Sequence, residues 1–475
     1  MINNKQPQTA DEIRLAENSH REKSVIREWD NAHVYHPWAS IAETNSDYGI
    51  IRGAKGIFVH DAEGRRYIDG PGGMWCVNIG YGRQEIADAI AEQAMALNYA
   101  SPWTSATEPS AVLARRIAEK TPADLNHVFF TTDGSSAVDT AIRFTHFYNN
   151  ILGKPEKKII IAREKGYHGS SYLAASLSGK ERDRRFLDVN TELVRFIGNV
   201  NPYIRPDGMT IDQWCQAKLE ELEAKITELG ADRVAAFIAE PVLASGGVIV
   251  PPKGYHKGCL EICRRYGVLY ISDEVVTGFG RLGHWFASEA VFGITPDIIT
   301  CAKGLTSGYV PMGAAIFSDT LLKQISNDAD ADILFSNGYT YSGHPVAAAA
   351  ALKNMDIIED ERILDHVRKV TPHFQKRLQQ LGEAFRIVGD ARGMGLLGCL
   401  EGAPAPELPE AQKLQIDHHF GARMDAATEK RGLLVRPIIN MCVFSPPLII
   451  SEQEIDSMFD ILAEALIEVE AEMLG

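Results

Sequence analysis

The sequence predicts an α/β protein built around a mainly parallel sheet that helices cover on both faces. Two observations carry this prediction. Short, almost wholly apolar segments recur through the middle of the 475-residue chain, and helical stretches at 136–149 and 211–229 lie between them. Apolar strands that alternate with helices are typical of a parallel sheet buried on both faces. The candidate strands are residues 127–131, 158–162, 234–239, 268–272 and 298–302.

Smaller units flank this α/β middle. Residues 56–70 predict two short strands around an Asp-Ala-Glu-Gly turn. Beyond residue 345 the pattern is mainly helical, and Ser451 and Glu454 have the Ser-x-x-Glu spacing of a capping box at the start of the last helix. A chain of this length is too long to fold around one small hydrophobic core, so we expect more than one domain. We expect an N-terminal segment 1–80, a large domain 81–344 and a C-terminal segment 345–475 that forms a small α+β domain with the N-terminal one.

The composition excludes several classes of function. The formal net charge of −15 argues against non-specific nucleic-acid binding, which needs a basic face. No segment approaches the roughly 18 apolar residues of a membrane-spanning helix, and the first 30 residues lack the apolar core of a signal peptide. The seven cysteines are scattered without a CxxC pair, which indicates reduced thiols in a cytoplasmic protein and no zinc site. We expect no metal at His418 and His419 either, because adjacent helix residues face different directions.

Chemically active side chains follow the candidate strands at their carboxyl ends, where ligands of open α/β sheets bind. The turn Gly134-Ser135 comes after the first strand and leads into a helix, a position that suits a phosphate. Tyr167 follows the second strand in "GYHG". Glu240, Asp273 and Lys303 follow the next three strands directly.

Each of these features has an ordinary explanation when it is taken alone. A Gly-Ser turn can be a plain helix cap, a tyrosine can stack in the core, and Lys303 can reach solvent from a strand end. Together they supply an anion cradle, a flat stacking face, a carboxylate and an amine. Pyridoxal 5'-phosphate (PLP) requires this set of groups, and its aldehyde reacts with a lysine amine.

The stretch that begins "LYISDEVV" and ends "DIITCAKG" resembles the signature of the class III PLP-dependent aminotransferases of fold type I. The matching features are Asp-Glu-Val after a strand, Pro-Asp before the next strand and Lys-Gly at its end. The likeness covers nearly the whole chain and is greatest to ω-amino acid and amine:pyruvate transaminases. One departure is the phosphate turn, which reads Asp133-Gly134-Ser135-Ser136 where the family usually has Ser-Gly-Ser-Glu.

The resemblance implies a large domain with a mainly parallel seven-stranded sheet, PLP as the cofactor, and specific roles around its ring. Lys303 would form the Schiff base with the cofactor and then move the proton, and Asp273 would keep the pyridine nitrogen protonated. Tyr167 would stack on one ring face and Val276 would press on the other. Glu240 would belong to the polar network beside the ring.

The resemblance also implies how the phosphate and the substrate are held. Gly134 and Ser135 would bind the phosphate together with Thr340 of the partner subunit, so we expect a homodimer or a dimer of dimers with active sites at the subunit interface. A guanidinium binds a carboxylate through two hydrogen bonds, and Arg436 would bind the carboxylate of pyruvate or alanine and swing away for an amine donor. The residues expected around the substrate are Trp75, Trp103, Tyr167 and Arg436.

We expect the enzyme to move an amino group from an amine or ω-amino acid to pyruvate, giving alanine, by a ping-pong mechanism. β-Alanine, taurine, a diamine and an aryl-alkylamine all stay open as donors. Alternatives within the family are a 4-aminobutyrate/2-oxoglutarate-type aminotransferase, an aminomutase and a decarboxylating transaminase. Outside the family, "GFGRLG" at 278–283 matches Gly-x-Gly-x-x-Gly and leaves an NAD-dependent oxidoreductase as a remote alternative. A binding protein that keeps the fold without the catalysis is a further alternative.

Overall fold

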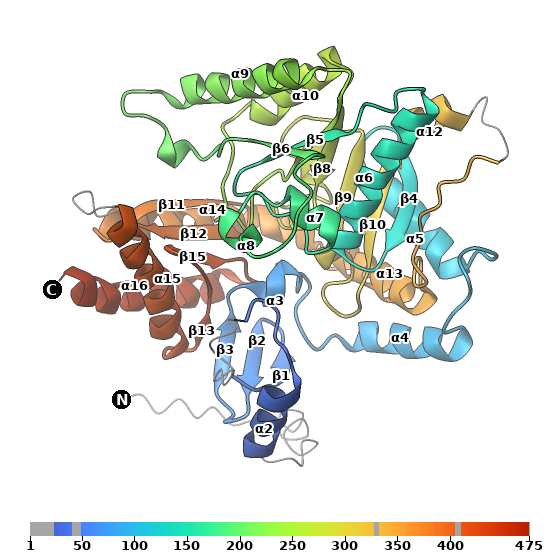
Figure 1. Cartoon of the computed structure of the whole chain (residues 1–475). Helices are drawn as coiled ribbons and strands as arrows, with labels where there is room; N and C mark the ends of the chain where they lie inside the picture. The colour runs from blue at the N-terminus through green and yellow to red at the C-terminus, as the bar shows by residue number, and fades with distance from the viewer. Residues whose placement is uncertain (1–22, 40–48, 327–331, 404–409, 475) are drawn as a thin grey trace.

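A seven-stranded sheet forms the centre of the molecule (Figure 1). The computed structural model describes residues 23–39, 49–326, 332–403 and 410–474, without the side chains of 410–419 and 474. The spatial order of the strands is β4-β10-β9-β8-β7-β5-β6. The strands are β4 (Leu125–Thr131), β5 (Ile159–Arg163), β6 (Val194–Ile197), β7 (Val234–Ala239), β8 (Leu269–Asp273), β9 (Ile298–Cys301) and β10 (Gly313–Ser318).

The sheet is parallel except for one strand, as the sequence predicts. β6, β5, β7, β8 and β9 pair in parallel, and β10 lies antiparallel to both of its neighbours, β4 and β9. Two strands, β6 and β10, are missing from the five candidates. Residues at the carboxyl ends of β7, β8 and β9 meet at one edge of the sheet because these strands are neighbours and run in the same direction.

Helices cover both faces of the sheet, which explains why its strands are apolar throughout. Successive residues of a strand point to opposite faces. Ile160 therefore joins the core under α6, whereas Ile161 joins the core under α9 and α10. The covering helices are α5 (Glu108–Ala118), α6 (Gly134–Ile151), α9 (Ile211–Leu229), α10 (Tyr255–Arg265), α12 (Asp319–Ser326) and α13 (Pro345–Asp360).

The N- and C-terminal parts of the chain pack together beside the large sheet. Figure 1 shows β13 (red) next to β3 (blue), and the two pair in parallel through Leu433 and Ile68. Both residues belong to one apolar core that also contains Ile57 and Leu448. The limits expected at 80/81 and 344/345 stay predictions. This four-stranded sheet consists of β1 (Ile51–Lys55), β2 (Phe58–Asp61), β3 (Arg66–Asp69) and β13 (Leu433–Leu434).

The C-terminal segment is mainly helical, as the sequence predicts, and it also contains a four-stranded sheet. Its order is β11-β12-β15-β14, and its short strands lack the alternation that would mark them. The predicted cap of the last helix is confirmed, because Ser451 Oγ accepts from the Glu454 amide at 3.2 Å and the Ser451 amide donates to Glu454 Oε2 at 2.8 Å. These elements are β11 (Val388–Met394), β12 (Leu397–Gly402), β14 (Arg436–Ile438), β15 (Met441–Phe444), α14 (Ile363–Ala384), α15 (Glu410–Glu429) and α16 (Glu452–Leu474).

Two further sequence observations can be located in the fold. The Gly-x-Gly-x-x-Gly stretch 278–283 forms turns and opens no helix, so it does not have the strand–turn–helix setting of a dinucleotide site. His418 and His419 lie in α15 at positions whose side chains are outside the described part of the structure.

None of the described helices is both long and apolar enough to cross a membrane. The remaining helices are α2 (Lys23–His33), α3 (Gly72–Trp75), α4 (Gln84–Ala96), α7 (Tyr172–Leu177), α8 (Glu181–Arg184) and α11 (Ala287–Ala290).

Candidate active site

A cavity of about 450 Å³ lies at the carboxyl ends of the central strands. Its inner wall comes from residues at or just beyond the ends of β4, β5, β7, β8 and β9. Its outer wall comes from α8 and from the terminal segments. The cavity brings together nine of the residues singled out from the sequence. They are Trp75, Gly134, Ser135, Tyr167, Glu240, Asp273, Val276, Lys303 and Arg436.

Lys303 stands at the end of β9, on the cavity wall. Its backbone is left-handed, with φ of 45°, a conformation that costs a non-glycine residue of order 1 kcal/mol or more and is often found at functional sites. Burial lowers the pKa of its amine, and the Asp273 carboxylate opposes that shift. A lowered pKa increases the neutral, nucleophilic form of the amine, so Lys303 has the chemistry that a carbonyl-bearing cofactor needs.

The Asp273 carboxylate is buried and receives three hydrogen bonds. Oδ2 lies 2.7 Å from Nδ1 of His168, and Oδ1 accepts from Thr300 Oγ1 at 3.1 Å and from the Val275 amide at 3.2 Å. Asp273 is 3% exposed and His168 is 4% exposed. These donors hold the carboxylate in one orientation toward the cavity. Sequence reasoning assigned no role to His168, because its place beside Tyr167 gives no sign that the ring turns toward Asp273.

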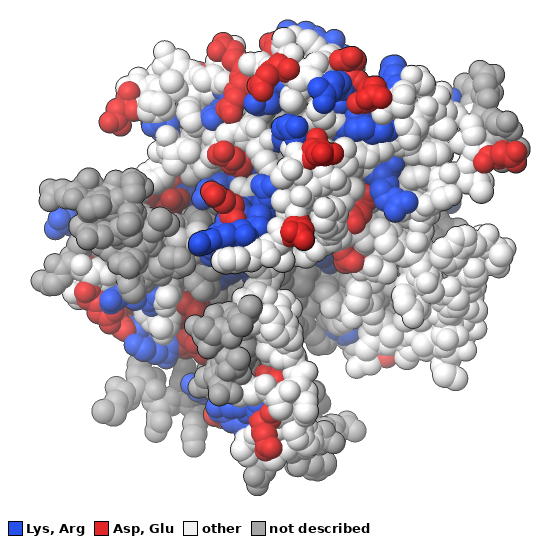
Figure 2. All heavy atoms as spheres, viewed as in Figure 1, with Lys and Arg blue, Asp and Glu red and all other residues white. Residues whose placement is uncertain are grey.

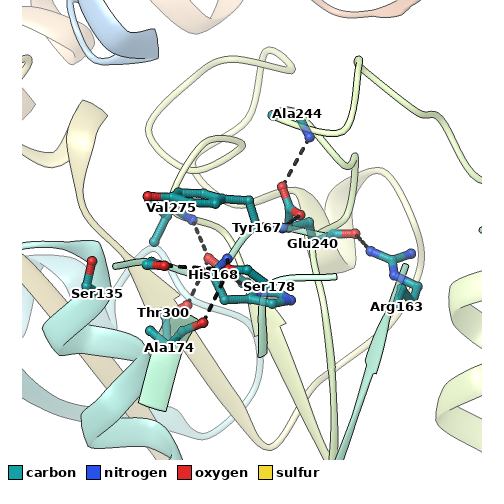
Figure 3. Close-up of polar contacts among 12 residues, drawn as sticks. Ser135, Arg163, Tyr167, His168, Ala174, Ser178, Glu240, Ala244, Val275 and Thr300 are labelled. Atoms are coloured by element: carbon teal, nitrogen blue, oxygen red, sulfur yellow. Dashed lines mark hydrogen bonds and ion pairs between the residues drawn. The ribbon is translucent and has the colours of Figure 1, made fainter. Parts of the chain in front are cut away.

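Glu240 fixes the segment that carries Tyr167. Its Oε1 accepts from the Tyr167 amide at 3.0 Å and its Oε2 accepts from the Ala244 amide at 3.1 Å. Figure 3 shows Arg163 and Ala244 reaching Glu240 from different sides, with Arg163 donating to the backbone carbonyl. Burial raises the pKa of the Glu240 carboxyl. Glu240 therefore joins the end of β5 and the Tyr167 segment to the loop that follows β7.

The start of α6 forms an anion cradle. Asp133 caps the helix, since its Oδ1 accepts from the Ser136 amide at 3.0 Å while the Asp133 amide donates to Ser136 Oγ at 3.1 Å. This reciprocal pair accounts for the unusual Asp and Ser of the turn. The first backbone bond of the helix comes from Ala137, at 3.1 Å to the Asp133 carbonyl, which leaves the amides of Gly134 and Ser135 for an anion.

The residues present fit PLP. A Cβ on Gly134 would lie 3.0 Å from the Val275 side chain, so glycine is needed where the helix start meets the segment after Asp273. The cradle, the aromatic ring of Tyr167, the buried carboxylate and the amine of Lys303 line one cavity. This is the donor and acceptor set that the cofactor requires.

The outer wall of the cavity is rich in charge. Arg436 lies with its guanidinium carbon 5.7 Å from the ring centre of Trp75. Lys180 donates to Ser245 Oγ, and its ammonium is 5.1 Å from the ring centre of Tyr167. Burial lowers the pKa of Lys180 to about 8. Lys180, Arg182 and Asp183 are cavity residues that sequence reasoning missed, because a charged run such as "KERDRR" carries no sign of burial.

Two predicted site residues do not line this cavity. Trp103 is 64% exposed and packs near Gly338, where an added Cβ would be 3.3 Å from its ring. Trp103 does not reach the cavity of its own chain, so its predicted part in substrate binding stays a prediction. Thr340 is also exposed, and its carbonyl accepts from the Tyr99 hydroxyl at 3.0 Å. Its expected role is in the partner's site, so it stays a prediction.

Comparison with known proteins identifies the family. The family model described as aminotransferase class-III matches residues 41–466. The putrescine–pyruvate aminotransferase of Pseudomonas aeruginosa is 37% identical over 96% of this chain and 100% of its own. The diaminobutyrate–2-oxoglutarate transaminase of Halomonas elongata is 38% identical over 86% of this chain and 88% of its own. The (S)-enantioselective ω-transaminase of Thermomicrobium roseum superposes with a TM-score of 0.89 at 36% identity, over 94% of this chain and 99% of its own.

The chain belongs to the class III aminotransferases. It is an enzyme that transfers amino groups and depends on PLP, and its fold is that of fold type I. The predicted family, cofactor and enzyme class are confirmed. The dehydrogenase alternative and the binding-protein alternative are set aside.

Proposed function

We propose that this enzyme moves an amino group from an amine or ω-amino acid to pyruvate, giving alanine, in two half-reactions that share one cavity. The observation that supports the proposal most is a single cavity lined by the Lys303 amine, the Asp273 carboxylate and the Arg436 guanidinium. The first two serve a cofactor, and the third serves a substrate carboxylate. Trp75 offers the same substrate end a flat apolar face.

Lys303 and Asp273 carry the chemistry in this proposal. Bound PLP supplies an electron sink for the electron pair that remains when the substrate loses its Cα proton. Lys303 anchors the cofactor covalently and then, as a free amine, takes that proton and returns it to another carbon. Asp273 holds a proton at the pyridine nitrogen, and the hydrogen bonds from His168 and Thr300 keep its carboxylate in place.

Other residues bind and orient the cofactor. Tyr167 and Val276 would cover the two faces of the ring, and Glu240 holds the backbone of Tyr167. The amides of Gly134 and Ser135 would bind the phosphate, and Thr340 of the partner subunit would complete that site in a homodimer. All seven cysteines are free thiols, which suits a reducing cytoplasm.

A 2-oxoglutarate-dependent reaction is the second candidate. The observation that favours it is the presence of Lys180 and Arg182 in the same cavity as Arg436. Those cations offer a place for a second carboxylate, which pyruvate lacks and 2-oxoglutarate has. The Halomonas elongata relative is named for that acceptor.

Measuring the two half-reactions separately tests both candidates. The PLP form is mixed with L-alanine, β-alanine, putrescine or 1-phenylethylamine, and the aminated form is mixed with pyruvate or 2-oxoglutarate. We expect pyruvate to be the faster acceptor at equal concentration. A clear preference for 2-oxoglutarate contradicts the proposal and favours the second candidate.

A further inference from the structure

We propose that Asp183 is the internal counter-ion of Arg436 and receives its guanidinium whenever the substrate in the cavity carries no carboxylate. This inference rests on the proposed function, in which Arg436 binds the carboxylate of pyruvate and alanine and must leave it for an amine donor. The function leaves open where the guanidinium then goes. Asp183 stands in α8, on the outer wall of the same cavity.

The two side chains have complementary unsatisfied atoms. Among the described residues, Nε of Arg436 and Oδ2 of Asp183 are both buried without a hydrogen-bond partner. The side chain of Asp183 is only 7% exposed, so water does not easily replace the missing donor. A buried donor and a buried acceptor that both lack partners each carry a desolvation cost. A contact between them removes both costs at once.

Arg436 is loosely held at present. Its Nη1 contacts the sulfur of Met74, and its guanidinium lies 5.7 Å from the ring centre of Trp75. In the described part of the chain no carboxylate lies within ion-pair distance of it. Arg436 and Asp183 line the same cavity. Burial lowers the pKa of Arg436, and Tyr167 and the charge of Asp183 counteract that shift. The long side chain of arginine has the freedom to turn toward Asp183.

The two oxygens of Asp183 are held differently. Oδ1 accepts a hydrogen bond from Nε of Arg182 at 3.0 Å and lies 2.9 Å from its Nη2, whereas Oδ2 has no hydrogen bond and only a long ion-pair contact of 3.7 Å with the Lys180 ammonium. A carboxylate substrate therefore takes Arg436, and Asp183 remains beside Lys180. An uncharged amine donor leaves Arg436 without an anion, and Oδ2 of Asp183 then accepts the guanidinium.

The test replaces the carboxylate and compares two donors. In Asp183→Asn we expect kcat/KM of the first half-reaction with 1-phenylethylamine to fall about tenfold, the scale of one lost charge-assisted hydrogen bond. The same constant with L-alanine should change less than about twofold, because Arg436 then pairs with the substrate. Asp183→Glu should restore most of the loss. The matched control is Glu181→Gln, which removes an exposed carboxylate from the same helix and should change neither donor. Figure 2 shows acidic and basic side chains together on the surface over α8, where the control change falls.

A double-mutant cycle separates this contact from a general disturbance of the cavity. In an Arg436→Ala background, Asp183→Asn should no longer distinguish the two donors. Equal losses with both donors in Asp183→Asn, or a selective loss that persists without Arg436, overturn the inference. Asp183→Ser serves as the second variant if the asparagine variant fails to fold, and the same outcomes decide.

The outcome also shows which proposal has failed. If Arg436→Ala itself affects alanine and 1-phenylethylamine equally, the proposed role of Arg436 falls and this inference falls with it. If Arg436→Ala is selective for alanine but Asp183→Asn is indifferent to the donor, only this inference is overturned.

Discussion

The inner and outer ends of the active-site cavity are built differently. At the inner end, the carboxylates of Asp273 and Glu240 are at most 5% exposed, and each of their four oxygens is matched by a hydrogen-bond donor. At the outer end, three buried atoms lack a hydrogen-bond partner among the residues that the structure describes: Nε of Arg436, Oδ2 of Asp183 and Nε1 of Trp75. The inner end is complete, and the outer end has unused hydrogen-bonding capacity.

The difference follows from where the side chains are attached. Glu240, Asp273 and Lys303 stand at the ends of adjacent strands, so the hydrogen bonds of the sheet fix their spacing. Arg436 and Asp183 reach the cavity on side chains from β14 and α8, which belong to separate parts of the fold. A fixed inner end suits one cofactor in one orientation. An adaptable outer end suits two substrates that differ in charge.

The largest predicted loss of activity is at Lys303, at the inner end of the cavity. Lys303→Ala removes the proposed covalent anchor of the cofactor and the proposed proton carrier, so we expect turnover to fall more than about a thousandfold. The wild-type protein should be yellow, and borohydride reduction should attach the cofactor covalently to Lys303, as peptide mass mapping would show. An alanine variant with near-normal turnover would remove the basis of the site assignment.

A smaller but still large loss is expected at Asp273. Asp273→Asn keeps the shape of the side chain and removes the charge that faces the cofactor nitrogen. We expect the single-turnover rate to fall at least about a hundredfold with every donor, the scale of a removed electrostatic stabiliser. Equal losses for alanine and amines would support the contrast between the two ends of the cavity, because the inner end should not distinguish substrates. Wild-type rates in this variant would contradict the proposed role.

At the outer end the loss should depend on the substrate. Arg436→Ala should weaken kcat/KM for L-alanine and pyruvate by about 2 kcal/mol, at the low end for a broken ionic contact because Arg436 is only partly buried. An uncharged amine should lose far less in its own half-reaction. Stopped-flow measurement of the two half-reactions checks this. Losses of the same size for both would reduce Arg436 to a structural residue.

The smallest predicted effect concerns pH and Lys180. Its pKa of about 8 means that Lys180 is charged below about pH 8 and neutral above it. The charged form adds to the attraction of the outer wall for a carboxylate, among the facing charges of Asp183, Glu240, Arg182 and Arg436. We expect KM for pyruvate to rise up to about fivefold between pH 7 and pH 9, the scale of one weak ionic interaction. Lys180→Met should flatten that profile, and an unchanged profile would show that another group is responsible.

The sequence predicts the inner end of the cavity better than the outer end. Glu240, Asp273 and Lys303 can be found because each directly follows an apolar strand, and parallel strands bring such positions together. His168 cannot be found in this way, since its contact with Asp273 depends on how the turn after β5 bends. Asp183 has no signal at all, because a charged run predicts a solvated surface. Trp103 is exposed in the single chain, so its predicted place beside the substrate stays a prediction.

The pairing of β13 with β3 has a consequence for how the protein is made. Residues 433–434 complete a sheet that begins near residue 51, and the same junction brings Arg436 to Trp75. At a synthesis rate of about 5–20 residues per second, roughly 20 to 70 s separate β3 from its partner strand on the ribosome. During that time Ile57 and Ile68 lack the C-terminal residues that make up most of their core, which leaves apolar surface open to chaperones or to aggregation. The Arg436 side of the active-site cavity can therefore form only after most of the chain has been synthesised.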